Sequence, residues 1–459
     1  MAGRAHEAGA IHGDFGYRGP AWLRTPIDVN ALLKSLWPLT VHKGSDGVLE
    51  AGGVKATELK EQFGTPAYIF DEDDFRARCR AFKAAFKGAD VYYAGKAFLC
   101  KAIVRILVEE GLSLDVCTGG ELSTALQAGM EPQRIGFHGN NKSMAELQRA
   151  VDAGIGRIIV DSFDEIERLY KIGKNVDVMV RVTVGVEAHT HEFIATAHED
   201  QKFGFGLADG TAFKAAAKII RDGKLTLKGF HSHIGSQIFD ASGFEISARR
   251  LLKLHKQVKD ELGVELPEMD LGGGFGIAYT SQDDPSPADD LARRMFKIVK
   301  DECDALQLNV PHLSVEPGRA IVGPSMFTLY EVGTVKPLDG IRTYVSVDGG
   351  MSDNIRTALY DASYSATIAS RTSDADPMLA RVVGKHCESG DVVVKDEFLP
   401  ADTKTGDLLA VPGTGAYCRS MASNYNHVPR PPVIAVRDGQ ARVIVRRETE
   451  DDLLALDVG

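Results

Sequence analysis

The chain has 459 residues, 44% of them hydrophobic and 25% charged, so it can bury a sizeable core and is neither disordered nor collagen-like. Its formal net charge is −11 and no basic block stands out, which gives little support to nucleic-acid or membrane-surface partners. No apolar run reaches the roughly 18 residues that a membrane-spanning helix requires.

The N-terminal part of the sequence divides into two stretches. Residues 1–25 are rich in Gly, Ala and His and lack the charged-then-apolar pattern of a secretory signal, so we expect a mobile tail. Residues 26–66 come before the repeating pattern described next. We expect them to join the C-terminal β domain and to add strands to it.

Residues 67–325 alternate between short β-branched runs and helical patterns. The expected strands are Val91–Tyr93, Leu114–Cys117, Ile135–His138, Ile158–Val160, Val178–Val184, Leu225–His233, Met269–Leu271 and Leu313–Val315. Apolar spacings of three and four residues predict helices at Ala102–Glu110, Leu122–Ala128, Met144–Ala153, Glu165–Ile172, Phe213–Arg221, Phe244–Leu262 and Ala288–Leu306. About eight such units predict an α/β fold, a closed TIM-like (β/α)8 barrel, with a doubly wound sheet as the competing architecture.

Residues 326–459 have a different pattern, with little helical periodicity and much Gly, Pro and Asp. Short alternating runs occur at Thr328–Val332, Thr343–Val347, Val392–Val394, Leu408–Val411 and Ala441–Val445. This part of the chain is therefore expected to form a second, mostly β domain.

The six cysteines are scattered without paired spacing. They are Cys79, Cys100, Cys117, Cys303, Cys387 and Cys418. Neither a disulfide framework nor a zinc ribbon is expected from this distribution, and a reducing, cytoplasmic location is expected.

Lys96 follows the first expected barrel strand, within Tyr92–Ala97. A lysine directly after a buried strand can lose solvation, which lowers its pKa and prepares it to form an imine. The alternative is a surface lysine whose aliphatic stem lies along the protein. Lys96 taken alone does not separate these two interpretations.

Two other expected strands lead into polar and glycine-rich segments. His233 and Ser236 lie in Gly229–Gln237, and Gly272–Gly274 lie in Asp270–Gly276. Consecutive glycines let backbone N–H groups converge on a phosphate. The dinucleotide fingerprint and the P-loop lysine are both absent, and a glycine cluster can also be an ordinary turn.

The last expected barrel strand ends in Glu316, with Arg319 close behind. These two side chains could simply form a surface ion pair. Together with Lys96, His233 and the glycine cluster, however, they supply an imine former, an aromatic ring, a phosphate cradle and an acid that holds a pyridinium. Pyridoxal phosphate requires such a set.

Five motifs resemble, in their order along the chain, those of the diaminopimelate decarboxylase family, which belongs to the alanine-racemase-like, fold type III class. They are Tyr93–Ala97, His233–Gln237, Gly272–Gly276, Glu316–Arg319 and Cys387–Asp391. The resemblance runs from about Pro26 to the C-terminus. The family combines a barrel with a β domain, which agrees with the division made above from sequence patterns.

For the barrel, the resemblance implies that pyridoxal 5'-phosphate is bound covalently to Lys96 and that His233 stacks on its ring. It implies that Ser236 and Gly272–Gly274 bind the phosphate and that Glu316 faces the ring nitrogen. A carboxylate there keeps that nitrogen protonated, so the ring can accept the electron pair left by departing carbon dioxide. Glu316 therefore favours decarboxylation over racemisation.

For the β domain, the resemblance implies that Arg356 and Tyr360 bind a distal carboxylate of the substrate and that Glu388 binds its distal ammonium. Arg319 would share the carboxylate or help with the phosphate, and the motif does not separate these roles. Bidentate guanidinium contacts suit a planar carboxylate. Tyr417 is implied to contact both cofactor and substrate.

Cys387 is implied to return a proton to the reacting carbon and to come from the partner subunit of a homodimer with shared active sites. An unpaired cysteine is otherwise most often a small apolar residue. Only the match of the motif Cys387–Asp391 to the family favours a catalytic role for Cys387 over a purely apolar one.

Three weaker patterns remain. The His-rich stretch Glu187–Glu199, with His189, His191 and His198, lacks the H-E-x-x-H spacing, so we expect a loop covering the site and no metal. Asp115 with Cys117, and Gly139–Lys142, match further strand-end motifs. They are expected to shape the site rather than to react.

The sequence thus predicts decarboxylation of meso-2,6-diaminopimelate to L-lysine and carbon dioxide. A related ornithine, arginine or carboxynorspermidine-type decarboxylase is the nearest alternative, and Arg356 disfavours it because such relatives lack an arginine for a distal carboxylate. A non-catalytic cofactor-binding protein is the other alternative, which the pair Cys387 and Glu388 disfavours. The expected partners are the small-molecule substrate and a second copy of the chain.

Overall fold

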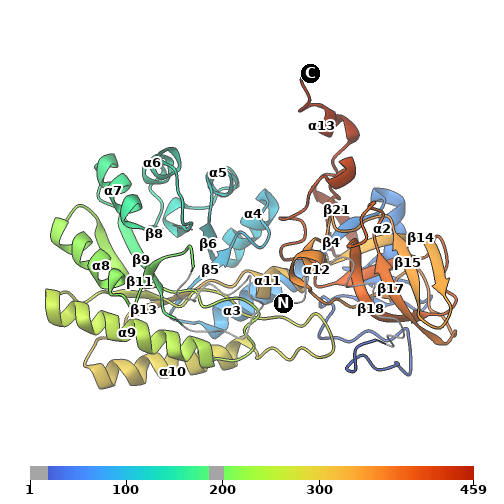
Figure 1. Cartoon of the computed structure of the whole chain (residues 1–459), viewed down its shortest axis with the longest axis horizontal. Helices are drawn as coiled ribbons and strands as arrows, with labels where there is room; N and C mark the ends of the chain where they lie inside the picture. The colour runs from blue at the N-terminus through green and yellow to red at the C-terminus, as the bar shows by residue number, and fades with distance from the viewer. Residues whose placement is uncertain (1–18, 186–200) are drawn as a thin grey trace, which may run out of the picture. The chain divides into compact units, whose positions relative to one another are not determined.

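The computed structural model describes residues 19–185 and 201–459. Within it the chain forms two compact units (Figure 1). The barrel unit consists of Arg76–Ile277 and Pro285–Ile321. The β unit consists of residues 19–75 together with Ala278–Asp284 and Val322–Gly459.

Eight parallel strands form a closed barrel. In ring order they are β5 (Asp90–Ala94), β6 (Ser113–Val116), β7 (Ile135–Phe137), β8 (Arg157–Val160), β9 (Asp177–Thr183), β11 (Thr226–His231), β12 (Glu268–Asp270) and β13 (His312–Val315). β13 pairs with β5, and β8 pairs with β9, so the sheet has no open edge between them. The predicted barrel is confirmed at all eight expected strands, and an open doubly wound sheet is excluded.

Helices connect the barrel strands and cover their outer side (Figure 1). They are α4 (Lys101–Glu110), α5 (Gly119–Gln127), α6 (Met144–Ala153), α7 (Phe163–Ile172), α8 (Thr211–Asp222), α9 (Ser242–Leu262) and α10 (Ala288–Leu306). The short α11 (Arg319–Val322) follows the last barrel strand, β13. A short strand β10 (Phe205–Gly206) and a 3-10 turn η1 (Pro132–Arg134) complete this unit. The seven predicted helices correspond to α4 through α10 because their apolar stripes pack on the strands.

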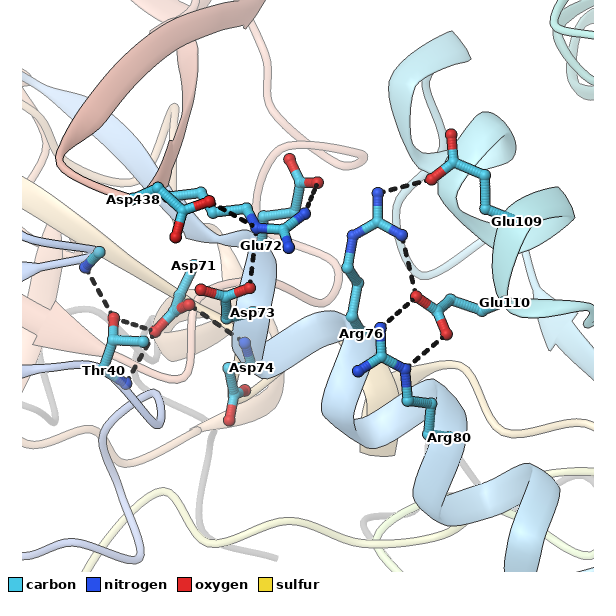
Figure 2. Close-up of polar contacts among 12 residues, drawn as sticks. Thr40, Asp71, Glu72, Asp73, Asp74, Arg76, Arg80, Glu109, Glu110 and Asp438 are labelled. Atoms are coloured by element: carbon cyan, nitrogen blue, oxygen red, sulfur yellow. Dashed lines mark hydrogen bonds and ion pairs between the residues drawn. The ribbon is translucent and has the colours of Figure 1, made fainter.

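Local signals explain the helix boundaries. In α6, Ser143 and Glu146 form a reciprocal capping box at the start, and Gly154 ends the helix in the left-handed conformation. Helix α3 (Glu72–Ala85) is fixed against α4 by charge: Arg80 contacts both oxygens of Glu110 at 2.8 and 2.9 Å (Figure 2). This bidentate geometry holds the first helices of the barrel unit together.

The β unit is built on one large sheet in the order β18-β17-β15-β14-β4-β20-β21, with β19 bridging β14 and β16. Its strands are β4 (Ala67–Asp71), β14 (Met326–Leu338), β15 (Arg342–Val347), β16 (Thr367–Ile368), β17 (Pro377–Val383), β18 (Val392–Pro400), β19 (Leu408–Pro412), β20 (Val433–Arg437) and β21 (Gln440–Val445). Its helical segments are α2 (Ala56–Phe63), α12 (Arg356–Tyr360), η2 (Tyr425–His427) and α13 (Glu450–Leu454). The mostly β character expected for this part of the chain is confirmed.

The strand β4 lies in this sheet, although the sequence pattern placed residue 67 at the start of the barrel. It pairs antiparallel with β14 and parallel with β20. All five of its residues are buried, so its apolar run resembles that of a barrel strand and periodicity does not distinguish the two.

The segment before β4 packs on the same sheet. Its strands β1 (His42–Lys43), β2 (Leu49–Ala51) and β3 (Val54–Lys55) form a separate three-stranded sheet. Trp37 packs edge-on against Phe327 of β14, with ring centroids 5.9 Å apart, in a cluster that includes Leu49. The Asp71 carboxylate accepts hydrogen bonds from the amide and hydroxyl of Thr40 (Figure 2).

Two global features follow from the described residues. None of their helices is both long and apolar enough to cross a bilayer. All six cysteines are free thiols, in agreement with the expectation that the chain has no disulfide framework.

Candidate active site

Polar side chains gather where the barrel strands end. Asp115 and His231 lie near the carboxyl ends of β6 and β11. Further groups follow the ends of other strands: Lys96 after β5, His138 after β7, Ser236 after β11, Gly272–Gly274 after β12 and Glu316 after β13. The carboxyl ends of parallel barrel strands share one rim, and TIM-like barrels carry their chemistry there.

The glycine cluster brings three strand ends together through their backbones. A Cβ at Gly272, Gly273 or Gly274 would overlap the carbonyl oxygens of Ser232, Glu316 and Gly235, respectively. Gly272 and Gly274 also have positive φ, at 71° and 106°. The Glu316 amide donates to the Gly272 carbonyl at 2.9 Å, which fixes Glu316 beside the cluster.

The amides of this cluster are not equivalent. Gly272 N–H donates to Asp270 Oδ1 at 2.7 Å, and Gly273 N–H donates to His233 Nδ1 at 3.2 Å. Within the described part of the chain, the Gly274 amide has no acceptor. It is therefore the glycine amide best able to donate to a bound anion.

Ser236 and Arg319 form the second part of an anion site. Both are buried, and the Arg319 guanidinium donates to Ser236 Oγ at 2.9 Å. A guanidinium and a hydroxyl beside a glycine loop are suited to a phosphate. This contact favours the phosphate role for Arg319, one of the two roles that the sequence left open.

A buried ion pair supports the glycine cluster from inside the barrel. Arg157 of β8 binds Asp270 at the end of β12, and Ser314 of β13 donates to Asp270 Oδ2 at 2.6 Å. Arg157 also lies over the Tyr92 ring, 3.9 Å from its centroid. Asp270 thus contacts both Arg157 in the barrel interior and the Gly272 amide at the rim.

Glu316 belongs to a buried group of four side chains, which we call the Glu316 cluster: Asp115, His138, His231 and Glu316. His138 Nε2 and His231 Nε2 each lie 3.1 Å from Glu316 Oε1, and His138 Nε2 lies 3.2 Å from Asp115 Oδ1. In the described residues no hydrogen bond or ion pair reaches Glu316 Oε2. Glu316 therefore has one oxygen that faces two imidazoles and one left for a ligand.

The charges of the Glu316 cluster depend on one another. Burial alone would lower the pKa of His138, but Glu316 and Asp115 outweigh it and raise this pKa to about 9. Burial alone would raise the pKa of Glu316, but the imidazoles hold it well below its usual range. Burial and the charge of Glu316 raise the pKa of Asp115 to about 7. Burial lowers the pKa of His231, so His138 is the charged imidazole of the pair.

Lys96 and His233 lie close enough for an electrostatic interaction. Burial, and then the charges of Lys96 and Arg181, hold the pKa of His233 well below its usual range, so its imidazole is neutral. A neutral ring is consistent with Nδ1 accepting the Gly273 amide. Burial raises the pKa of Cys117 to about 12, which makes it a poor nucleophile and agrees with a role in shaping the site.

Of the two interpretations of Lys96, a desolvated lysine and a surface lysine, the structure of the protein alone agrees with the second. Lys96 is exposed, because it lies on the turn after β5 rather than on the buried strand. Its suitability for covalent chemistry therefore rests on its place at the barrel rim, not on burial by the chain itself.

In the β unit, Arg356 begins α12 and is buried. Its Nη1 donates to the Tyr364 hydroxyl, and its guanidinium lies 4.7 Å from the centroid of the Tyr279 ring. Among the described residues Arg356 has no carboxylate partner, and its Nε has no hydrogen-bond acceptor. A buried cation without an anion indicates that a ligand supplies one.

Tyr360 and Tyr417 are the other aromatic candidates of the β unit. Tyr360 ends the helix that Arg356 begins, and a spacing of four residues puts both on one helix face. Tyr417 has a φ of 65°, a left-handed conformation that is uncommon for an aromatic residue. Such outliers concentrate at functional sites.

Cys387 and Glu388 lie on the loop between β17 and β18. Asp391 fixes this loop by accepting hydrogen bonds from the amides of Met351 and His386 at 2.6 and 2.7 Å. Cys387 is exposed, and its amide lies 3.4 Å from Asn426 Oδ1. The thiol is therefore presented at the surface of the chain rather than enclosed by it.

The His-rich stretch Glu187–Glu199 lies outside the described residues. Within the described ranges, the only three His, Cys, Asp or Glu residues whose ligand atoms converge are His138, His231 and Glu316. This group belongs to the Glu316 cluster.

The barrel unit matches a known family. Residues 72–323 match the family described as pyridoxal-dependent decarboxylase, pyridoxal binding domain. The closed barrel, the rim residues and this match together define the chain as a pyridoxal-dependent decarboxylase.

Proteins similar to this one over nearly its whole length identify the family within the pyridoxal-dependent decarboxylases. Diaminopimelate decarboxylase of Mycobacterium tuberculosis is 55% identical over 440 residues, which cover 93% of this chain and 98% of the relative. That of Bacillus subtilis is 46% identical over 427 residues, covering 91% and 97%. The crystal structure of the M. jannaschii diaminopimelate decarboxylase with L-lysine has a TM-score of 0.86 at 32% identity, covering 92% and 99%. The chain belongs to the diaminopimelate decarboxylase family.

The rim residues fit pyridoxal phosphate. The Gly274 amide, Ser236 and Arg319 offer donors for a phosphate on a backbone where a Cβ would not fit. Glu316 offers an ionised carboxylate with one uncommitted oxygen, which suits a protonated ring nitrogen. Lys96 supplies an exposed amine at the same rim.

Sequence reasoning did not assign a role to His138 or His231. Both stand at the carboxyl end of an expected strand, so their position was a usable signal. Tyr279 and Tyr364, which contact Arg356, were also missed. They meet only in the folded β unit, so no local pattern could have joined them.

We predict that Gly273→Ala destabilises the protein and weakens cofactor binding, because the added Cβ overlaps the Glu316 carbonyl. Overpacking of this kind costs about 1–3 kcal/mol. Thermal unfolding and a cofactor-binding titration measure the two effects. Gly120→Ala in α5 is the matched control, since its Cβ meets nothing closer than 3.7 Å. Equal behaviour of the two variants would contradict the close packing described here.

Proposed function

We propose that this protein decarboxylates meso-2,6-diaminopimelate at its D centre, giving L-lysine and carbon dioxide in the last step of lysine biosynthesis. The observation that carries the proposal is the buried Arg356 without a carboxylate partner among the described residues. The names of the Mycobacterium tuberculosis and Bacillus subtilis relatives, and the L-lysine in the M. jannaschii structure, support the same substrate.

The barrel residues would hold the cofactor. When bound, pyridoxal phosphate supplies an aldehyde that can take up an amine and a ring that can accept an electron pair. Lys96 would bind the aldehyde carbon, and the neutral His233 would lie against the ring. The phosphate would be held by Ser236, Arg319 and the Gly272–Gly274 loop. Within that loop the Gly274 amide would be the main donor. Glu316 would hold a proton at the ring nitrogen.

The β unit would select the substrate by its distal end. Arg356 offers a planar guanidinium to a planar carboxylate, and Tyr360 on the same helix face offers a hydroxyl. Glu388 would bind the distal ammonium, so that end of the substrate is recognised as an intact amino acid. Tyr417 would contact both cofactor and substrate, and its left-handed backbone supports a functional constraint there.

Cys387 would return a proton to the reacting carbon from a partner subunit. Its exposure on the chain supports this role, because a residue that completes another subunit's site must be presented at the surface. The active unit would then be a homodimer with two shared sites. We also propose that the two compact units are the functional domains, and that the enzyme works in the cytoplasm, where its six free thiols remain reduced.

We predict that Arg356→Ala lowers kcat/KM for meso-diaminopimelate about tenfold to a hundredfold and leaves cofactor absorbance intact. Losing a charged hydrogen-bond partner costs on the order of 1.5–3 kcal/mol. Carbon dioxide release is measured with meso-diaminopimelate, ornithine and arginine. Arg356→Lys keeps the positive charge but loses the paired N–H donors of the guanidinium, so its kcat/KM should lie between those of wild type and Arg356→Ala. An unchanged kcat/KM in Arg356→Ala, or wild-type preference for ornithine or arginine, would overturn the substrate assignment.

We predict that mixing two inactive variants, Lys96→Ala and Cys387→Ala, restores activity. Random pairing makes about half of the dimers hybrid, each with one intact site, so activity should return to roughly a quarter of wild type. The control mixes Lys96→Ala with Glu316→Gln: both lesions lie in the barrel unit, so no hybrid site is intact. A tagged pull-down verifies subunit exchange. No recovery despite exchange would rule out a shared site.

A further inference from the structure

We propose that His138 and Asp115 are positioning residues for Glu316. His138 carries a proton between the two carboxylates, and this charge keeps Glu316 ionised through Oε1 while Oε2 remains for the cofactor ring nitrogen. The inference rests on the proposed function, because only a pyridoxal phosphate enzyme requires a carboxylate at that nitrogen.

The geometry gives His138 a central position in the Glu316 cluster. It follows β7, and its Nε2 lies 3.2 Å from Asp115 Oδ1 and 3.1 Å from Glu316 Oε1. His231 reaches the same Glu316 oxygen from β11. Both imidazoles lie beside Oε1, so their charge acts on the carboxylate from that side and leaves Oε2 unoccupied.

Glu316 needs such a partner because it is buried. In the described part of the chain it forms no ion pair with a lysine or arginine. Arg157 is engaged by Asp270, and the nearest carboxylate to Arg181 is Asp161 at 3.9 Å. A buried carboxylate with no cation beside it would take up a proton instead. His138 is the cation that prevents this.

Asp115 explains why His138, and not His231, is the charged imidazole. Two carboxylates flank His138, and their charges outweigh the burial of its ring, whereas Glu316 alone does not outweigh the burial of His231. The other titratable groups facing these residues are Tyr92, Cys117, Glu121, Arg157, Arg181, His233 and Asp270. None of them forms an ion pair with His138.

In the holoenzyme, Glu316 and the ring nitrogen would share one proton. The charge of His138 beside Glu316 Oε1 would stabilise the carboxylate, which would then favour a proton at the ring nitrogen. Removing that charge would make Glu316 more basic, so Glu316 would compete for this proton. The cofactor would then be a poorer electron acceptor.

The first test uses His138→Gln, which removes the charge and keeps a polar side chain. His255→Gln is the matched control, because His255 is equally buried but packs on Phe230 outside the site. Glu316→Gln gives the reference for an unprotonated ring. Each protein is loaded with ring-15N-labelled pyridoxal phosphate, and the 15N shift reports ring protonation without turnover.

We expect wild type and His255→Gln to show a protonated ring nitrogen, and His138→Gln to shift toward Glu316→Gln. One unit of pKa change is a tenfold change in the proton equilibrium, so kcat of His138→Gln should fall about tenfold with cofactor still bound. A 15N shift in His138→Gln equal to that in His255→Gln would overturn the inference.

The second test needs no variant that might misfold. In wild-type protein without cofactor, labelled with 15N-histidine, one imidazole should remain doubly protonated at pH 8, since the pKa of His138 is raised to about 9. His255 is the internal contrast: burial lowers its pKa to about 4, so it is neutral at pH 6. The pH 8 imidazolium should deprotonate at lower pH in Asp115→Asn and in Glu316→Gln.

The results separate the competing explanations. No imidazolium at pH 8 overturns the inference. A neutral imidazole signal that a chelator changes would instead identify His138, His231 and Glu316 as metal ligands, which also overturns it. Failure of the proposed function appears differently, as wild-type protein that releases no carbon dioxide from meso-diaminopimelate whatever the state of His138.

Discussion

The rest of the site depends on one constraint, which is that the buried carboxylate of Glu316 must stay ionised. Burial alone would neutralise it, and the described residues give it no lysine or arginine partner. Two imidazoles from other strand ends lie 3.1 Å from one of its oxygens instead. The barrel makes this possible because closure brings the ends of β7, β11 and β13 to one rim.

The backbone near Glu316 is as constrained as its side chain. The glycine cluster packs directly on the carbonyls of neighbouring strand ends, and its first amide is held by Asp270. Asp270 is itself held by Arg157 across the barrel interior. Buried charged and polar contacts therefore connect Arg157 in the barrel interior, through Asp270, to the proposed phosphate site. These groups are individually costly to bury, and they are stable only because each has its partner.

The sequence was most informative where periodicity and local chemistry agree. The eight barrel strands could be predicted because parallel strands buried on both faces are short apolar runs. The strand β4 has the same kind of run, so the sequence did not show that it pairs in the β unit. β17 was not predicted because Pro377 and Arg381 interrupt its apolar pattern. For the site, motif resemblance named Lys96 and Glu316. The position of His138 at the end of an expected strand was visible in the sequence, but its contacts with Asp115 and Glu316 were not, because these side chains meet only through tertiary packing.

The central claim is that Lys96 anchors the cofactor at this rim, and borohydride reduction followed by peptide mapping tests it most directly. Reduction fixes the cofactor to the lysine that holds it, whatever the substrate or the dimer contributes. We expect a pyridoxyl group on Lys96 alone. A pyridoxyl group on another lysine, or none on a protein loaded with cofactor, would contradict it.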